Sequence, residues 1–332
     1  MTVTHATVTP EDDGIRLDRW FKRHHPDLSH GMLEKWLRTG QIRVEGKRAK
    51  SNQRLEAGQE IRLPPLVADV AAAPKPTPSA APKVDDAWAK TLTDAILHID
   101  DQVIVLNKPP GLAVQGGTGM ADHHLDAMLD VLTFDAPDRP RLVHRLDKDT
   151  SGVLVLGRSA SATAKLAAAF RSREARKCYW AVTVGVPKLL QGRIDAPLAK
   201  MAGRHGDKVE VDEDDGKRAV TWYRTIEHLT RKCAWLELEP RTGRTHQLRA
   251  HCALMNTPIQ GDGKYGGKDA YLEGVGISRK LHLHARAIRM PHPAGGQLMV
   301  VAPLPPHMAQ TFTFLGFEER AAGKPFVAFE ED

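Results

Sequence analysis

The chain has 332 residues, with 47 Lys and Arg against 41 Asp and Glu and a formal net charge of +6, which allows a large core and more than one domain. Three cysteines without paired spacing, Cys178, Cys233 and Cys252, exclude a disulfide framework and a cysteine-based zinc site, and they fit a reducing compartment. The N-terminus has no apolar run behind a basic start, and no apolar stretch approaches the roughly 18 residues of a membrane span. We therefore expect a cytoplasmic protein with no signal peptide.

Residues 14–63 predict a compact module of two helices and a small hairpin. Apolar residues recur at helical spacing from Leu17, and again after Ser29, which suits a helix N-cap. Gly40 ends the second helix. Alternating residues then indicate short strands, the last of them at 60–63.

The positive charge of the chain is concentrated in this module. Between Arg16 and Arg54, eleven Lys and Arg stand against four Asp and Glu, and the rest of the chain carries about −1. Such an excess is typical of a nucleic-acid-binding module. The helices, the hairpin and their turn residues resemble an S4 RNA-binding domain. The resemblance implies RNA contacts by basic residues of the module: Arg38, Arg43, Lys47 and Arg48.

Two further regions follow the module. Residues 64–90 are rich in Pro and Ala and predict a semi-flexible linker. Residues 91–325 predict a larger second domain in which strands outnumber helices. The strand candidates are 96–99, 103–106, 153–156, 179–184, 221–226, 234–238 and 298–301, and the helix candidates are 124–132, 160–171 and 245–254. This pattern predicts an α+β fold with a mostly antiparallel mixed sheet, flanked by helices and loops.

Four segments of the second domain carry residues suited to chemistry. The first, 107–117, ends a strand in Asn-Lys-Pro-Pro-Gly and reaches a Gly-Gly pair that would let a phosphate backbone approach, although a tight loop is its ordinary interpretation. The second, 144–152, reads His-Arg-Leu-Asp-Lys-Asp-Thr-Ser-Gly and holds Asp147 beside a strand, as a nucleophile, a general base, a metal ligand or a plain turn residue. The third, 176–185, starts a strand whose Tyr179 could stack on a base and exchange a proton, or pack on a sheet face.

The fourth segment, 240–251, is a glycine turn that leads into a helix. Its Arg244 and Arg249 carry guanidinium groups, which pair bidentately with carboxylates and hold them ionised. His246 and His251 are five residues apart, which is poor spacing for a zinc pair on one helix. We therefore expect no metal, and we interpret Arg244 and His246 as structural or RNA-contacting residues.

In this order and spacing, the four segments resemble the RluA-type family of pseudouridine synthases. His-Arg-Leu-Asp followed by Thr-Ser-Gly is one match, and Gly-Arg-Thr-His-Gln-Leu-Arg is an independent one. The resemblance implies that Asp147 is the catalytic aspartate, Tyr179 the active-site tyrosine and Arg249 the basic partner of Asp147. It also implies that Arg145 fills the gap left by a flipped base and that Leu248 lines the pocket.

The reaction of this family determines which groups its active site needs. Isomerising uridine to pseudouridine breaks the N1–C1′ bond, rotates the uracil and joins C5 to C1′, so it needs no redox step and we expect no cofactor. The target base must leave the helix. The S4-like module and the loop at 107–117 are most similar to the C-type enzymes of the large ribosomal subunit, whereas the D-type enzymes would have His-Pro at Gln115-Gly116. The implied partner is 23S ribosomal RNA or the pre-ribosomal large subunit, bound by a monomer.

Three alternatives stand beside this interpretation. A D-type enzyme of the same family would modify other uridines of the same RNA. A ribosome-assembly factor would bind ribosomal RNA without needing catalysis. A glycosidase with Asp147 as nucleophile would need a second carboxylate as general acid, and no motif supplies one.

Overall fold

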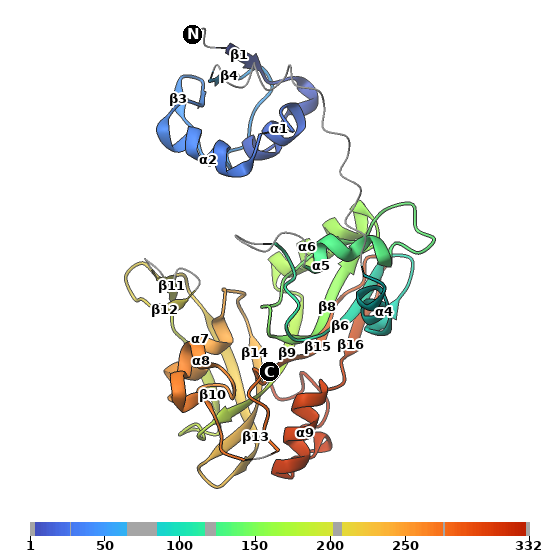
Figure 1. Ribbon diagram of the computed structural model, residues 1–332, viewed down its shortest axis with the longest axis vertical. Helices are drawn as coiled ribbons and strands as arrows, with labels where there is room; N and C mark the ends of the chain where they lie inside the picture. Colours follow the sequence, from blue (N-terminus) through green and yellow to red (C-terminus); the bar gives the residue numbers. More distant parts are fainter. Residues whose placement is uncertain are drawn as a thin grey trace. The chain divides into compact units, whose positions relative to one another are not determined.

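The computed structural model describes residues 4–26, 28–64, 85–116, 124–201, 208–274 and 276–329. The chain divides into two compact units, Met1–Ala81 and Pro82–Asp332 (Figure 1). Most of the predicted linker, 64–90, lies outside the described residues. Its last five residues already belong to helix α4 (Asp86–Asp94), which begins where the side chain of Asp85 accepts a hydrogen bond from the Ala87 amide.

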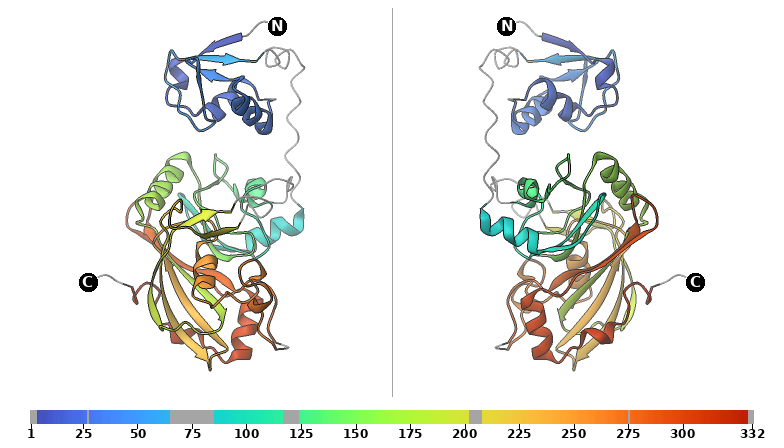
Figure 2. Two further views of the ribbon diagram at one scale, coloured as in Figure 1. Left: turned by 90° about the vertical axis from the view of Figure 1, so that its left-hand side faces the viewer. Right: turned by 90° about the vertical axis from the view of Figure 1, so that its right-hand side faces the viewer.

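The first unit combines a four-stranded antiparallel sheet, in the order β1-β4-β2-β3, with two helices (Figure 2). Its elements are β1 (Thr4–Thr7), η1 (Pro10–Asp12), α1 (Leu17–His24), α2 (His30–Thr39), β2 (Arg43–Val44), β3 (Lys47–Arg48) and β4 (Glu60–Leu63). Strand β1 pairs with β4 and lies before residue 14, where the predicted module begins. The two predicted helices and the hairpin are present.

Local sequence explains both ends of α2. The hydroxyl of Ser29 accepts a hydrogen bond from the Met32 amide at 3.3 Å, and Gly40 adopts the left-handed conformation with φ 73°. Trp20 of α1 and Trp36 of α2 are buried in one apolar cluster with residues of β4. The helices therefore cover one face of the sheet with their apolar sides.

The second unit is built around a ten-stranded mixed sheet. The main path runs β10-β13-β14-β9-β15-β8-β6-β5, with β16 paired to β15 and β7 to β8. Its strands are β5 (Ile96–Ile99), β6 (Val103–Lys108), β7 (Arg141–Leu142), β8 (Ser151–Gly157), β9 (Arg176–Val184), β10 (Gln191–Asp195), β13 (Val220–Leu229), β14 (Cys233–Pro240), β15 (Leu283–Pro291) and β16 (Gln297–Val301). Among the described pairs of this sheet only β15 with β8 is parallel, which confirms the predicted mostly antiparallel α+β fold. A separate hairpin consists of β11 (Leu198–Lys200) and β12 (Val209–Val211).

Helices cover both faces of this sheet (Figure 1). Besides α4 they are α5 (Leu125–Met128), η2 (Leu129–Leu132), α6 (Ala160–Ser172), α7 (Gln247–Leu254), α8 (Gly263–Gly266), η3 (Gly267–Ala270), α9 (Pro306–Leu315) and η4 (Glu319–Ala322). The helices predicted at 124–132, 160–171 and 245–254 correspond to α5 with η2, to α6 and to α7. In the described part of the chain, no helix is long and apolar enough to cross a bilayer.

The period-two alternation of strands distributes side chains between the two helical layers. On β6, Ile104 faces the core under α5 and η2, and Val105 faces the core under α6. On β14, Leu236 packs in the cluster that includes α7. Trp235 points the other way and meets Phe312 of α9 edge to face, with 4.8 Å between ring centroids. Apolar side chains therefore cover both faces of these strands over much of their length.

Candidate active site

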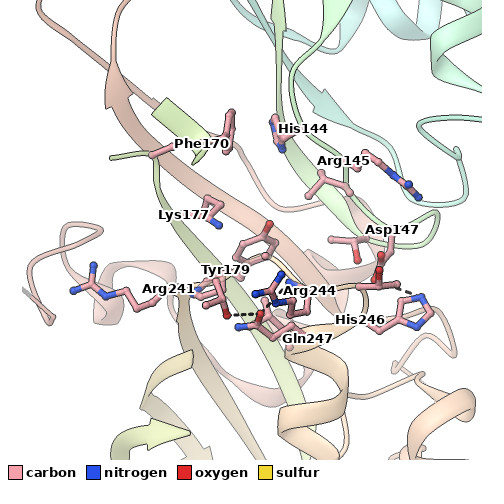
Figure 3. Close-up of a pocket in the computed structure, with 18 of the residues that line it drawn as sticks. His144, Arg145, Asp147, Phe170, Lys177, Tyr179, Arg241, Arg244, His246 and Gln247 are labelled. Atoms are coloured by element: carbon pink, nitrogen blue, oxygen red, sulfur yellow. Dashed lines mark hydrogen bonds and ion pairs between the residues drawn. The ribbon is translucent and has the colours of Figure 1, made fainter. Parts of the chain in front are cut away.

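An open cleft of about 1020 Å³ lies in the second unit (Figure 3). Its walls come from the loop before β8, the end of α6, the start of β9 and the segment from the end of β14 into α7. The structure brings together in this cleft every site residue predicted for the second domain: Arg145, Asp147, Tyr179, Arg244, His246, Leu248 and Arg249. The predicted RNA contacts of the first unit belong to α2, β2 and β3.

Strand pairing explains why Asp147 and Tyr179 meet in one cleft. Asp147 lies on the loop that leads into β8, and Tyr179 lies on β9. Ala285 of β15 pairs with Gly152 on one side and with Tyr179 on the other. Gly152 has φ +107°, and a Cβ atom there would lie 2.2 Å from the carbonyl oxygen of Ala285. The glycine that ends the His-Arg-Leu-Asp segment therefore permits the close approach of β8 to β15.

Arg249 is anchored by a carboxylate that sequence reasoning missed. It donates two hydrogen bonds to Asp262, from Nε at 2.7 Å and from Nη2 at 2.6 Å, and Asp262 is buried. Its Nη1 lies 4.0 Å from Oδ2 of Asp147. The expected pairing of Arg249 with Asp147 is thus a long contact made by a guanidinium whose strong partner is Asp262. A bidentate pair of this kind fixes the orientation of the cation.

His246 provides the second contact to the Asp147 carboxylate. It precedes α7 with φ 52°, and its Nε2 lies 3.9 Å from Oδ2 of Asp147. Its Nδ1 lies 3.0 Å from the hydroxyl of Tyr265, which accepts a hydrogen bond from the Val209 amide. Burial lowers the pKa of His246, although the charge of Asp147 opposes this, so the ring is neutral at pH 7. A Tyr265 hydroxyl that donates to Nδ1 would leave the ring proton on Nε2, the nitrogen that faces Asp147.

Tyr179 presents a neutral phenol to the cleft. Burial raises its pKa far above the usual range, and the negative charge of Asp147 raises it further. The hydroxyl therefore stays protonated at neutral pH and is suited to donate a hydrogen bond. Leu248 is buried on α7 and contributes an apolar part of the wall.

Two neutral histidines hold the segment that carries Asp147. Nε2 of His144 accepts a hydrogen bond from the Val155 amide at 2.9 Å, and burial lowers the pKa of His144 to about 3. Ser151 lies 2.9 Å from Nδ1 of His284, whose pKa burial also lowers to about 3. The first histidine of the motif is therefore a structural acceptor.

The buried side chain of Lys108 gives the segment at 107–117 a structural role. Its ammonium is buried and donates to the carbonyls of Pro109 at 2.8 Å, Leu112 at 2.9 Å and Lys148 at 3.0 Å. Burial lowers the pKa of Lys108 to about 7, against the opposing charges of Asp149 and Asp147. The lysine thus ties this loop to the backbone next to Asp147. Of the Gly-Gly pair predicted to approach phosphate, the second glycine lies outside the described residues.

The cleft is strongly basic. Eight Lys and Arg line it against two acidic residues, Asp147 and Glu239. Glu239 is buried and bonded by Arg176, at 2.8 Å for both contacts, and by Arg241 at 3.1 Å. This charge balance favours a polyanionic ligand. Over the described ranges, no three His, Cys, Asp or Glu side chains are arranged to hold a metal ion.

Comparisons with known proteins agree with this site. The family described as RNA pseudouridylate synthase matches residues 102–254. Ribosomal large subunit pseudouridine synthase C of Rickettsia typhi is 34% identical over 300 residues, which cover 90% of this chain and 97% of that protein. RNA pseudouridine synthase 4, mitochondrial, of Arabidopsis thaliana is 33% identical and covers 90% of this chain and 78% of that protein. The solved structure of human RNA Pseudouridylate Synthase Domain Containing 4 is similar with a TM-score of 0.59 and 32% identity, covering 70% of this chain and 96% of that one.

The mixed sheet, the cleft and these relatives define an RNA-modifying isomerase. The chain belongs to the RluA-type family of RNA pseudouridine synthases.

Three residues that support the site were absent from the sequence predictions: Lys108, Asp262 and Tyr265. The last two lie in the run Gly-Asp-Gly-Lys-Tyr-Gly at 261–266, where Asp262 also caps α8. A carboxylate between two glycines just after a helix is a signal for a helix cap, and it could have drawn attention to this turn.

Proposed function

We propose that this enzyme converts uridines of large-subunit (23S) ribosomal RNA to pseudouridine, with Asp147 as the catalytic nucleophile or base. The observation that carries the proposal is the position of the Asp147 carboxylate in a basic cleft, 4.0 Å from Arg249 and 3.9 Å from His246. The choice of RNA rests on the relatives named ribosomal large subunit pseudouridine synthase C, in Rickettsia typhi and Vibrio cholerae. The same relatives support the proposal of a C-type target set.

The proposed reaction uses the cleft residues as follows. The carboxylate of Asp147 attacks C1′ or removes the 2′ proton, and the N1–C1′ bond breaks. The uracil then turns and C5 bonds to C1′, either as the ester bond between C1′ and Asp147 breaks or as the proton held by Asp147 returns to C2′. The C5 proton passes to the freed carboxylate or to water. The Tyr179 phenol packs on the uracil as a neutral hydrogen-bond donor. Arg249 and His246 face the carboxylate, and such contacts tighten when substrate fills a site.

Base flipping requires a group that takes the place of the extruded base. Arg145 is exposed beside Asp147 and, among the described residues, has no hydrogen-bond or ion-pair partner. Its side chain is therefore available to enter the helix. Arg244 is less free, since its Nε donates to the Arg218 carbonyl at 3.1 Å, and it lines the mouth of the cleft.

The first unit is proposed to act as an S4-like RNA-binding domain, joined to the second by the linker. Arg38 is exposed on α2, and Lys47 and Arg48 are exposed on β3. Arg43 is committed in part to its own turn, where it donates to the carbonyls of Gly40 at 3.3 Å and Gly46 at 3.2 Å. We therefore assign direct RNA contact chiefly to the first three. The proposed setting is the cytoplasm, where a monomer meets 23S RNA or the pre-ribosomal subunit.

The test compares Asp147→Asn with Asp149→Asn, since both carboxylates lie in one loop and Asp149 does not line the cleft. Tritium release from 23S transcripts labelled at uridine C5 measures the reaction, and filter binding measures RNA affinity. Asp147→Asn is expected to fall to background release with RNA affinity retained, while Asp149→Asn releases tritium. Release by Asp147→Asn at the wild-type rate would refute the proposal.

Two cellular measurements separate the alternatives. Mapping pseudouridines in 23S RNA with and without the gene distinguishes a C-type from a D-type target set. Growth of a deletion strain restored equally by wild type and by Asp147→Asn would instead indicate a ribosome-assembly factor.

A further inference from the structure

The cleft continues beyond Tyr179 to a second basic region. Lys177 lies two residues before Tyr179 on β9, and both line the cleft, while Cys178 and Trp180 are buried in the core on the opposite face. Figure 3 shows Lys177 and Tyr179 projecting from the same strand into the opening. Two strand residues span about 6.6 Å, so a group bound by Lys177 lies next to the group that packs on Tyr179 rather than in the same place.

Within the described residues, the Lys177 ammonium has no partner of its own. In the described ranges its Nζ makes no hydrogen bond and no ion pair. The neighbouring carboxylate, Glu239, is instead bonded by Arg176 and Arg241. Burial lowers the pKa of Lys177 to about 8, with the charge of Glu239 acting in the opposite direction. A half-buried ammonium without an acceptor is unfavourable, and an anion entering the cleft would relieve that cost.

Two further cations line the same cleft. Arg171 lies in the last turn of α6, and Arg173 follows it as the left-handed C-cap, with φ 68°. Both are exposed, and neither has a hydrogen-bond or ion-pair partner within the described part of the chain. Cations at a helix C-terminus stabilise the helix, and this effect is enough to explain the positions of Arg171 and Arg173. It does not account for Lys177, which is on a strand and points into the cleft.

We infer that Lys177, Arg171 and Arg173 form a phosphate-binding site for the RNA strand that flanks the flipped uridine. The inference rests on the proposed function, because it takes the uridine to lie on Tyr179. Phosphodiester groups suit these three cations, which line the cleft and have no hydrogen-bond or ion-pair partner among the described residues. The contacts are therefore independent of sequence, and they position the backbone while Asp147 acts on the sugar.

The experiment uses the full chain with 23S transcripts labelled at uridine C5. Lys177→Met removes the charge and keeps the length of the side chain, Lys177→Arg restores the charge, and Arg173→Gln probes the exposed rim. Arg231→Gln, in the exposed turn between β13 and β14, is the matched control outside the cleft. KM and kcat come from tritium release, and RNA affinity is measured across a salt series.

Lys177→Met is expected to weaken RNA binding about tenfold, with a larger effect on KM than on kcat. The slope of log affinity against log salt should fall by about 0.7 to 0.9, as expected when one phosphate is no longer neutralised. Lys177→Arg should recover most of the affinity, Arg173→Gln should reduce the slope similarly, and Arg231→Gln should change neither.

An unchanged salt slope, or a loss confined to kcat, would overturn the phosphate site and assign Lys177 to the uracil chemistry. Arg173→Gln keeps the test valid if Lys177→Met misfolds, because Arg173 is exposed at a helix end. Asp147→Asn measured alongside separates the two proposals. If it still releases tritium, the proposed function fails. If it is inactive while the Lys177 and Arg173 variants keep the wild-type slope, only the phosphate site fails.

Discussion

Asp262 holds the guanidinium of Arg249 with two hydrogen bonds, at 2.7 and 2.6 Å, on the side away from Asp147. The side chain of Asp262 is fully buried, and the Arg249 side chain is 10% exposed. A buried bidentate pair orients the guanidinium before any substrate binds. Arg249 thus reaches Asp147 as a cation whose direction is already set by its other partner.

Replacing Asp262 should therefore affect both stability and turnover. Asp262→Asn keeps the shape of the side chain but leaves Arg249 as a buried cation without its counter-charge. We expect the free energy of unfolding to fall by about 3–5 kcal/mol and tritium release to slow markedly, as measured by denaturant unfolding and a C5-tritium assay. Asp269→Asn, on the exposed part of η3, is the matched control and should leave both values unchanged. A fully active, fully stable Asp262→Asn would contradict this positioning role.

Gly152 and Gly111 form a matched pair for testing the approach of β8 to β15. Both have positive φ, +107° and +87°, but a Cβ at Gly152 would meet the Ala285 carbonyl, whereas nothing lies within 4 Å at Gly111. Gly111→Ala should cost only the backbone strain, about 1–2 kcal/mol. Gly152→Ala should cost about 1–3 kcal/mol more from overpacking, and it should reduce turnover because the loop carrying Asp147 shifts. Equal effects of the two substitutions on unfolding would show that β8 and β15 can separate without penalty.

The lowered pKa of His144 predicts that the folded protein loses stability in mild acid. Its pKa is about 3 in the folded protein against 6.5 for an ordinary histidine, so between these values the unfolded chain binds the additional proton. The stability that this group contributes is complete above pH 6.5 and is lost as the pH falls toward 3. From pH 7 to 5.5 the loss should be about 1 kcal/mol.

The variant His144→Gln keeps an acceptor for the Val155 amide without titrating in this range. Denaturant unfolding at both pH values should show a pH dependence smaller by that amount, whereas the exposed His228→Gln should behave as wild type. An unchanged pH dependence in His144→Gln would mean that His144 is not the titrating group.

The proposed S4-like surface can be tested by its salt dependence. Lys47 and Arg48 are exposed on β3 and, unlike Arg43, donate no hydrogen bond to a carbonyl of the described residues. Lys47→Gln combined with Arg48→Gln should lower the salt slope of 23S RNA binding by about 0.9 for each duplex phosphate that these side chains no longer neutralise. Lys268→Gln, exposed in the second unit, serves as control. A double variant with the wild-type slope would remove β3 from the RNA surface.

Much of the fold could be predicted because its elements carry strong local signals. The N-cap at Ser29 and the glycine at Gly40 mark α2, and continuous apolar runs mark β6 and β8. Strand β15 could not be predicted in the same way, although it lies at the centre of the sheet. Its sequence interleaves His284 and Arg286 with apolar residues, and both of these side chains reach a partner distant in the sequence, the Ala302 carbonyl.

The site shows the same division. Asp147, Tyr179 and Arg249 were identifiable because the family resemblance assigns roles to their motifs. Asp262 and the role proposed for Lys177 were not identifiable, because both depend on burial and on which neighbouring charges are already paired. In the sequence, Lys108 looks like part of an ordinary turn. Its structural role is visible only in the three carbonyls that accept hydrogen bonds from its ammonium. Such three-dimensional charge balance leaves no periodic pattern in a sequence.

Ala285 pairs with Gly152 on β8 and with Tyr179 on β9, so the geometry of the cleft depends on the register of β15 with these two strands. In the described ladder, β15 meets β8 through only two residue pairs, His284 with Ser151 and Ala285 with Gly152. A slip of β15 by one residue would move Tyr179 by about 3.3 Å relative to the loop of Asp147, and it would turn β15 side chains to the other face. Substitutions along β15 can therefore misalign the carboxylate and the phenol while every side chain proposed to contact RNA stays intact.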